Sequence, residues 1–158
     1  MSGSASETAG VAGDPDGSGW RRAQDNVLGV LERLATRERE ALLVERFYER
    51  FFDSNPEVVP LFGPHSISER EEMIAETLRS LLALCENETG VRDSLRALGA
   101  SHAEYGVTTS MYPAFTVAFT ETLRELLGCD LSLEAETQVG WMLDEIGRIM
   151  AEAGEGIG

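Results

Sequence analysis

The chain has 158 residues, the size of one domain with a single hydrophobic core. Its 28 acidic residues against 13 basic ones give a formal net charge of −15, and every basic residue is an arginine. This composition argues against a nucleic-acid partner, because such binding needs a basic surface that neutralises phosphates. The sequence has no secretory leader and no apolar run of the ~20 residues that a membrane span needs. We therefore expect a cytoplasmic protein without a membrane partner.

The two cysteines, Cys85 and Cys129, form no metal-binding spacing with the two histidines. Each falls late in an expected helix or just after one, where a small buried residue is common. We expect two free thiols and a reducing compartment.

The N-terminal segment is rich in Ser, Gly, Ala and Asp and shows no hydrophobic periodicity. We expect residues 1–19 to form a disordered tail and residues 20–158 to form one folded domain. A first helix is predicted from Trp20 or Arg22, because apolar residues recur there at helical spacing. Its predicted buried face comprises Val27, Leu28, Leu31 and Leu34.

A second helix with a strongly aromatic face follows a charged connection, Thr36 to Glu40. It must end before Pro56, because the residue ahead of a proline avoids helical backbone and proline itself lacks the N–H. Residues 56–62 predict one short helical turn, which the Gly-Pro pair after it breaks. The apolar face of the second helix comprises Leu43, Val44, Phe47, Tyr48, Phe51 and Phe52.

Two overlapping capping boxes, Ser66 to Glu69 and Ser68 to Glu71, predict the start of a third long helix. This helix is expected to end near residues 87–90. Its apolar face comprises Ile74, Leu78, Leu81, Leu82 and Cys85.

The last two helices carry their own start and stop signals. The helix that precedes them, from Val91, is described in the next paragraph. A hydroxyl residue at 108–110 caps a helix that tolerates Pro113 in its first turn and ends at Gly128. Asp130 or Ser132 caps the final helix. The inner faces comprise Tyr112, Phe115, Phe119, Leu123 and Leu126 in the first and Trp141, Met142, Ile146, Ile149 and Met150 in the second. No segment alternates with period 2, so we predict an all-α fold of six substantial helices and one or two short ones.

The segment from Val91 to Val107 places a histidine on an apolar helical face. His102 shares that face with Val91, Leu95, Leu98 and Tyr105, because the steps between them are three and four residues. A neutral imidazole that faces an apolar interior needs partners for both ring nitrogens. A metal at one nitrogen and a hydrogen bond at the other would satisfy it, and an ordinary core histidine is the alternative.

Tyr48, Phe62 and His102 lie on three separate segments, and each is expected to point inward. So many large inward aromatics are compatible with a flat apolar guest between the helices. The alternative from these residues alone is a plain aromatic core.

Two separated stretches then resemble the globin family. Residues 47–62, F-Y-E-R-F-F-D-S-N-P-E-V-V-P-L-F, resemble the second and third helices of bacterial globins, most of all the globin domain of flavohaemoglobins. Residues 98–107, L-G-A-S-H-A-E-Y-G-V, resemble the proximal helix and the corner after it. Trp141 matches a tryptophan common in the final helix. Two motifs in the right order are much stronger than either alone.

The resemblance implies a globin fold of six to eight helices, packed three over three around haem b (iron protoporphyrin IX). It implies that His102 is the axial iron ligand and that Phe62 stacks on the haem. It also makes Tyr48 the distal residue, whose hydroxyl would stabilise negative charge on bound dioxygen. Leu98 and Val107 are assigned to the cofactor pocket with the histidine between them.

The distal residues of the third long helix can be placed in two ways. Counting back from His102 gives Arg70, with Ile74 one turn deeper over the iron, whereas the local pattern R-E-E-M-I gives Glu69 and Met73. We prefer Arg70 and Ile74, because Ile74 lies on the apolar stripe. Neither choice gives the distal histidine or glutamine of better-known relatives, and an arginine on a helix flank can also turn to solvent.

The sequence offers further candidates around the iron that the resemblance implies. The second histidine, His65, follows Phe62 by three residues, and we expect a solvated loop residue. In flavohaemoglobins a tyrosine and a glutamate hold the axial histidine. Tyr112 matches the tyrosine, whereas Glu152 and Glu155 both remain candidates for the glutamate.

The resemblance implies reversible binding of dioxygen and of other diatomic gases, NO and CO. We expect no flavin or nicotinamide domain after the globin-like part, so nitric oxide dioxygenation would need an external reductase. One alternative is a haem-based gas or redox sensor that acts through a protein partner. Another is a cofactor-free all-α interaction module in which His102 is ordinary core. A monomer and a homodimer both remain open.

Overall fold

The regular structure is entirely helical in the computed structural model, which describes residues 17–62 and 67–157. The six long helices are α2 (Ser18–Leu34), α3 (Arg37–Ser54), α5 (Ile67–Cys85), α6 (Val91–Glu104), α7 (Met111–Leu127) and α8 (Leu133–Ile157). The short elements are η2 (Pro56–Val58), α4 (Val59–Phe62) and η3 (Gly128–Asp130). The predicted all-α class, with six long helices and short ones beside them, is confirmed.

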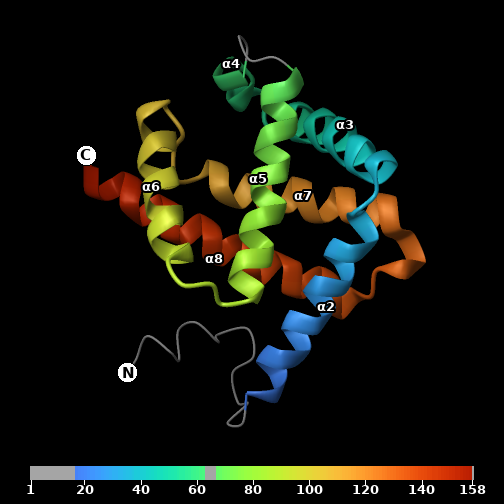
Figure 1. Cartoon of the computed structure of the whole chain (residues 1–158). Coiled ribbons are helices and arrows are strands. Elements are labelled where there is room, and N and C mark those ends of the chain that lie inside the picture. The colour runs from blue at the N-terminus through green and yellow to red at the C-terminus, as the bar shows by residue number, and fades with distance from the viewer. Residues whose placement is uncertain (1–16, 63–66, 158) are drawn as a thin grey trace.

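The helices form two layers (Figure 1). Helix α5 crosses in front of α7 and α8, α6 packs on α8 at one side, and α3 packs on α7 at the other. Helix α2 contacts both α5 and α8. The result is α2, α5 and α6 over α3, α7 and α8, the three-over-three packing that the resemblance implies.

Capping hydroxyls decide where two helices begin. The Thr36 hydroxyl accepts a hydrogen bond from the Arg39 amide at 3.2 Å, so α3 already begins at Arg37. The charged stretch predicted as a connection is therefore the first turn of α3. The Ser132 hydroxyl accepts from the Ala135 amide at 3.0 Å, which selects Ser132 over Asp130 as the cap of α8. Helix α2 begins at Ser18, two residues before the predicted Trp20.

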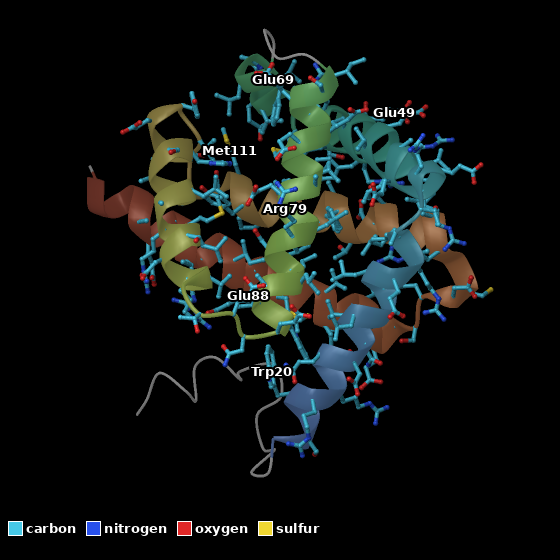
Figure 2. The ribbon with its side chains drawn as sticks, in the orientation of Figure 1. Trp20, Glu49, Glu69, Arg79, Glu88 and Met111 are labelled. Atoms are coloured by element: carbon cyan, nitrogen blue, oxygen red, sulfur yellow. The ribbon has the colours of Figure 1, made fainter. Side chains whose placement is uncertain are left out.

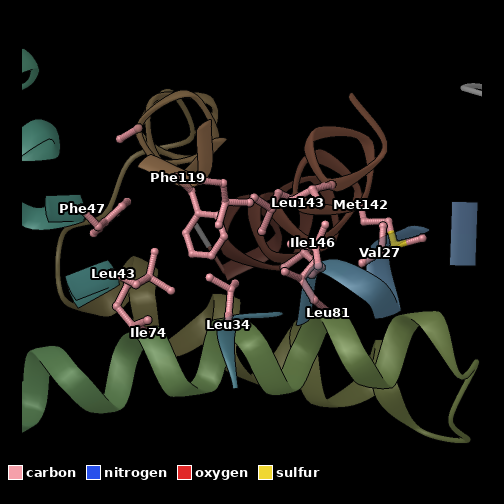
Figure 3. Packing of buried hydrophobic residues seen from close by; sticks show 14 of the residues in the cluster. Val27, Leu34, Leu43, Phe47, Ile74, Leu81, Phe119, Met142, Leu143 and Ile146 are labelled. Carbon is pink, nitrogen blue, oxygen red and sulfur yellow. The ribbon is translucent and has the colours of Figure 1, made fainter. Parts of the chain in front are cut away.

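The core contains most of the apolar faces predicted from the sequence (Figure 3). Phe47 lies at its aromatic centre, with ring centroids 5.1 Å from Phe51, 4.7 Å from Phe115 and 6.0 Å from Phe119. Each such pair adds about 0.5–1.5 kcal/mol to the free energy of burial. The side chains that are less than 2 % exposed include Phe47, Phe119, Leu34, Leu43, Ile74, Leu81, Leu123 and Ile149.

Three residues predicted on inward faces are exposed instead. Leu82 and Trp141 are each 39 % exposed, because they lie at the edge of the apolar stripe of their helix. Tyr105 is 76 % exposed, because α6 ends at Glu104 and the helical spacing no longer applies beyond it.

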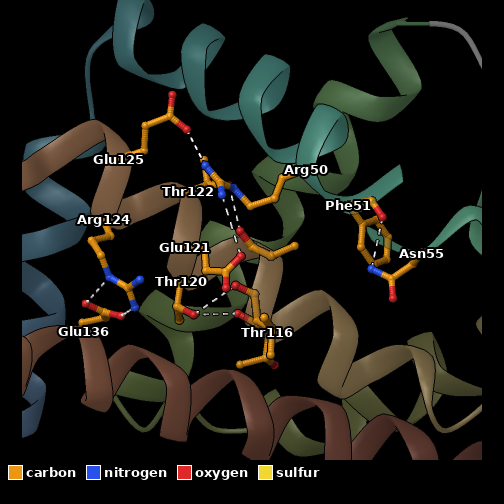
Figure 4. Close-up of polar contacts among 12 residues, drawn as sticks. Arg50, Phe51, Asn55, Thr116, Thr120, Glu121, Thr122, Arg124, Glu125 and Glu136 are labelled. Carbon is orange, nitrogen blue, oxygen red and sulfur yellow. Dashed lines mark hydrogen bonds and ion pairs between the residues drawn. The ribbon is translucent and has the colours of Figure 1, made fainter. Parts of the chain in front are cut away.

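Ion pairs join neighbouring helices of one layer at the surface (Figure 4). Arg50 of α3 pairs with Glu125 and Glu121 of α7, and Arg124 of α7 pairs with Glu136 of α8. Partly exposed pairs of this kind contribute little stability each, because solvent screens them. They orient the helices more than they stabilise them.

Both cysteines are free, as predicted. Burial raises the pKa of the Cys85 thiol to about 11, whereas Cys129 lies exposed on the surface. No helix in the described part of the chain is both long and apolar enough to cross a membrane.

Candidate functional site

A cavity of about 480 Å³ opens between helices α5, α6, α7 and α8 and reaches the end of α3 and α4. A volume of this size is typical of a site for a small molecule or cofactor. Figure 2 shows Met111, one of the lining residues, at the start of α7 between α5 and α6. Most of the lining side chains are apolar. They include Phe51, Val58, Leu61, Phe62, Leu98, Val107, Met111, Phe115, Leu143, Ile146 and Met150.

His102 lines this cavity from the last turn of α6. Its Nδ1 lies 2.9 Å from the Leu98 carbonyl oxygen, so the proton sits on Nδ1 and Nδ1 donates to that carbonyl. Burial lowers the pKa of His102, and the hydrogen bond to Leu98 opposes this only in part. The imidazole is therefore neutral at pH 7 and keeps a lone pair on Nε2.

A neutral imidazole with one nitrogen bound to a backbone carbonyl is the usual form of a metal-binding histidine. The opposite nitrogen is then free to bind iron. Together with apolar walls, which suit a flat porphyrin, this donor meets what a haem group requires of a protein. The residues present therefore fit the cofactor that the resemblance implies.

Helix α6 is held very close to α8, and this contact positions His102. A Cβ added at Gly99, one turn before His102, would overlap the backbone of Met150. Only glycine permits two helices to approach this closely. At the other end of α6, Arg92 donates to Glu145 of α8 at 2.8 Å. Burial raises the pKa of Glu145, but hydrogen bonds from Arg148 and Arg92 outweigh it and bring the pKa below its ordinary value.

Tyr112 lines the cavity from the first turn of α7, as the resemblance implies. Its Cβ packs on Gly147 of α8, where an added Cβ would lie 3.0 Å away, and burial raises the pKa of its hydroxyl. Glu152 pairs with Arg148 at the surface and does not line the cavity. The side chain of Glu155 lies outside the described residues, as does His65.

Tyr48 does not line the cavity, although it is buried. Its hydroxyl donates to the backbone carbonyl of Arg70 at 3.1 Å, and its ring packs edge-on against Phe62 with centroids 5.5 Å apart. The guanidinium of Arg70 lies 5.6 Å from the centre of the Tyr48 ring and 5.3 Å from that of Phe52. Burial raises the pKa of Tyr48 well above its ordinary value, and the charge of Arg70 opposes this. The distal role of Tyr48 thus stays a prediction, with a backbone carbonyl as a competing partner.

Helix α5 presents a different face to the cavity from the one preferred above. Glu69 and Met73 line it, whereas Arg70 and Ile74 do not. Ile74 is 2 % exposed and belongs to the core (Figure 3). A shift of one residue turns a helical side chain by about 100°, which is enough to move it from the cavity to the core. The cavity lining therefore corresponds to the alternative placement of the distal residues.

Five of the predicted site residues thus come together around one cavity: Phe62, Leu98, His102, Val107 and Tyr112. Sequence reasoning missed the acidic part of the wall, Glu72 and Glu76. The signal that identifies it is a second stripe on α5, offset from the apolar stripe, which comprises Glu69, Glu72, Met73, Glu76, Thr77 and Ser80.

The fold and the site define an all-α protein with a buried histidine that lines a mostly apolar cavity. The family model of the globins matches residues 45–150, and the chain belongs to the globin family. It is a haem-binding globin.

The chain is also similar to the flavohemoprotein of Rhizobium meliloti (strain 1021), with 25% identity over 88 residues. The match covers 54% of this chain and 22% of the relative. The chain thus corresponds to about a fifth of that protein's length.

Proposed function

We propose that the chain binds haem b in this cavity and that its core activity is reversible binding of dioxygen, with NO and CO as further ligands. The observation that carries the proposal is the state of His102. Its Nδ1 is bound to the Leu98 carbonyl, and its Nε2 is left as the donor in a pocket with mostly apolar walls.

Bound haem would supply an iron atom, which His102 would hold and which would take up a diatomic gas. The chain's own residues would hold the group and limit its contact with water. Phe62 and Tyr112 line the cavity and would flank the porphyrin, and the apolar side chains around it would limit the access of water to the iron. The Leu98 carbonyl orients the imidazole and fixes its tautomer.

Titration of the purified chain with hemin tests this proposal. We expect a Soret band at one haem per chain, and a ferrous form that binds CO and dioxygen reversibly. His102→Ala should weaken haem binding by at least about 100-fold, because even partners of a metal ligand are worth 10–100-fold. Ser101→Ala, a change at an exposed neighbour on the same helix, is the control and should leave haem binding intact. A wild-type chain without a Soret band would exclude the function.

Nitric oxide dioxygenation is a second activity, supported by the similarity to a flavohemoprotein. Bound haem would supply the one electron that dioxygen and nitric oxide need to combine to nitrate. A reductase must return that electron for turnover. Mixing the oxygenated protein with nitric oxide should form stoichiometric nitrate and ferric haem within the mixing time of a stopped-flow instrument. Slow or absent nitrate formation would restrict the protein to gas binding.

A further inference from the structure

A second hollow lies beside the cavity, between α5 and α6. It is a groove of about 660 Å³ that extends along the connection after α5 to the start of α6. Figure 2 shows two of its lining residues, Arg79 on α5 and Glu88 just after that helix. Glu76, Ser80 and Leu98 line both the groove and the cavity, so these three side chains separate the two spaces. We call them the junction.

The groove stays open because α6 is fitted to a different helix. Gly99 brings α6 into close contact with the backbone of Met150 on α8. Three of the residues of α6 that line the groove are small: Ser94, Ala97 and Ser101. Small side chains on this face leave space beside α5 that neither helix fills.

The hydroxyl of Ser80 is an exception among the hydroxyl groups of the cavity wall. Thr77 donates to the Met73 carbonyl at 2.9 Å, and Thr116 donates to the Tyr112 carbonyl at 3.3 Å. Ser80 is only 8 % exposed, yet its hydroxyl forms no hydrogen bond with any residue that the structure describes. A buried hydroxyl without a protein partner is unfavourable unless water can reach it. The junction must therefore have room for a molecule of about that size.

We propose that the junction is a second passage, through which small uncharged molecules reach the cavity from the groove. This inference rests on the proposed function, because the molecules concerned are the diatomic ligands of the haem. A space that admits water is close to the size that dioxygen, NO and CO need. A change of rotamer at Leu98 would supply the remaining width, whereas the Leu98 carbonyl would stay on His102.

Flash photolysis of the CO complex of the haem-loaded full chain tests this passage. Ser80→Leu places a branched apolar side chain in the junction and should narrow it. Leu98→Ala removes most of a side chain from the junction but keeps the carbonyl that holds His102, so it should widen the passage. Ser94→Leu is the matched control, because Ser94 is an exposed serine that lines the groove but not the cavity.

If the passage carries about half of the ligand flux, Ser80→Leu should lower the CO association rate about twofold. It should also raise the fraction of CO that rebinds before leaving the protein. Leu98→Ala should change both quantities in the opposite direction, and Ser94→Leu should stay close to the wild type. An unchanged rate in Ser80→Leu, or an equal fall in Ser94→Leu, would overturn the inference.

Ser80→Ala separates the space at the junction from the hydroxyl itself. It removes the same hydroxyl as Ser80→Leu without filling the junction, so CO association should not become slower. A fall as large as that in Ser80→Leu would mean that the lost hydroxyl, and not obstruction, sets the rate, which would also overturn the passage.

Xenon provides a readout that does not depend on gas binding at iron. In NMR spectra of the full chain under xenon pressure, the Leu98 methyl signals should shift in the wild type and should shift less in Ser80→Leu. Equal shifts in the two proteins, or none in the wild type, would contradict the passage even if Ser80→Leu lowers the haem content. A wild-type chain without a Soret band would instead reject the proposed function, so the two failures are distinguishable.

Discussion

The two sides of the cavity are built in different ways. On the α6 side, backbone lies directly on backbone, with Gly99 against Met150, and an ion pair from Arg92 to Glu145 ties down the start of the helix. On the α5 side, the wall consists of long side chains that include Glu69, Glu72 and Met73.

This difference shows which properties of the site follow from the fold. A contact between two backbones has no rotamers, so the position of His102 follows from helix packing alone. Long side chains have several rotamers of similar energy, so the chemistry beside the bound gas is set by local contacts. The side of the cavity with His102, the proposed donor to iron, is accordingly the more strongly determined by the fold.

The largest effect is expected from breaking the close approach of α6 to α8. Gly99→Val would force the valine side chain into the Met150 backbone, which cannot give way as a flexible side chain can. We expect a loss of about 3 kcal/mol in the free energy of unfolding, together with weaker haem binding. Urea unfolding of the apo and haem-loaded forms measures both.

Gly29→Ala is the matched control for that variant. Gly29 is also helical, but an added Cβ there meets nothing within 4 Å. The change should be neutral or stabilising by up to about 1 kcal/mol, because alanine is the better helix former. An equal loss of stability in both variants would mean that the contact between α6 and α8 is not what matters.

Substitutions at two neighbouring residues of α5 distinguish a residue of the cavity wall from a residue of the core. Ile74→Ala should cost about 2–4 kcal/mol of stability, because Ile74 is fully buried, and should leave the CO association rate nearly unchanged. Met73→Ala should cost less stability and should change the CO association rate, because Met73 lines the cavity. Flash photolysis and urea unfolding of the two variants would reveal the opposite pattern if Ile74, and not Met73, lay over the iron.

The sequence predicted the two halves of the site unequally, for physical reasons. His102, Phe62 and Tyr112 each belong to a segment whose own pattern defines its orientation, so their places follow locally. The count back from His102 did not give the register of α5, because it crosses the non-helical connection between Cys85 and Val91. One residue of error there exchanges Ile74 and Arg70 for Met73 and Glu69.

Contacts between residues far apart in the sequence could not be predicted from sequence patterns either. The amphipathic pattern correctly predicted that Tyr48 is buried, but nothing in it indicates that the hydroxyl reaches the Arg70 carbonyl on a helix 22 positions along the chain. Likewise, the closeness of Gly99 to Met150 depends on two helices separated by α7.

A smaller effect is expected at Tyr48. Tyr48→Phe removes one hydrogen bond to the Arg70 carbonyl and should lower stability by about 1 kcal/mol. Because that bond occupies the hydroxyl, we expect the dioxygen dissociation rate to rise less than about threefold, which corresponds to well under 1 kcal/mol. A rise of tenfold or more in stopped-flow measurements would show that the hydroxyl turns to the bound gas, as the resemblance to bacterial globins implies.

The smallest effect concerns the pH dependence of the apo protein, and its sign follows from the environment of His102. Burial holds the pKa of His102 below its ordinary value, so the folded state binds a proton less readily than the unfolded chain does. Stability therefore falls as pH decreases below about 6.5, the ordinary pKa of histidine, and the loss from this group ends once pH is below the folded-state pKa. In apo His102→Gln this part of the pH dependence should be absent, whereas Ser101→Ala should retain it. Urea midpoints of the three apo proteins at pH 7.5 and pH 5.5 measure the difference. Identical pH dependence in the wild type and His102→Gln would mean that the imidazole is exposed to solvent. That result would contradict its burial in the wall of the cavity.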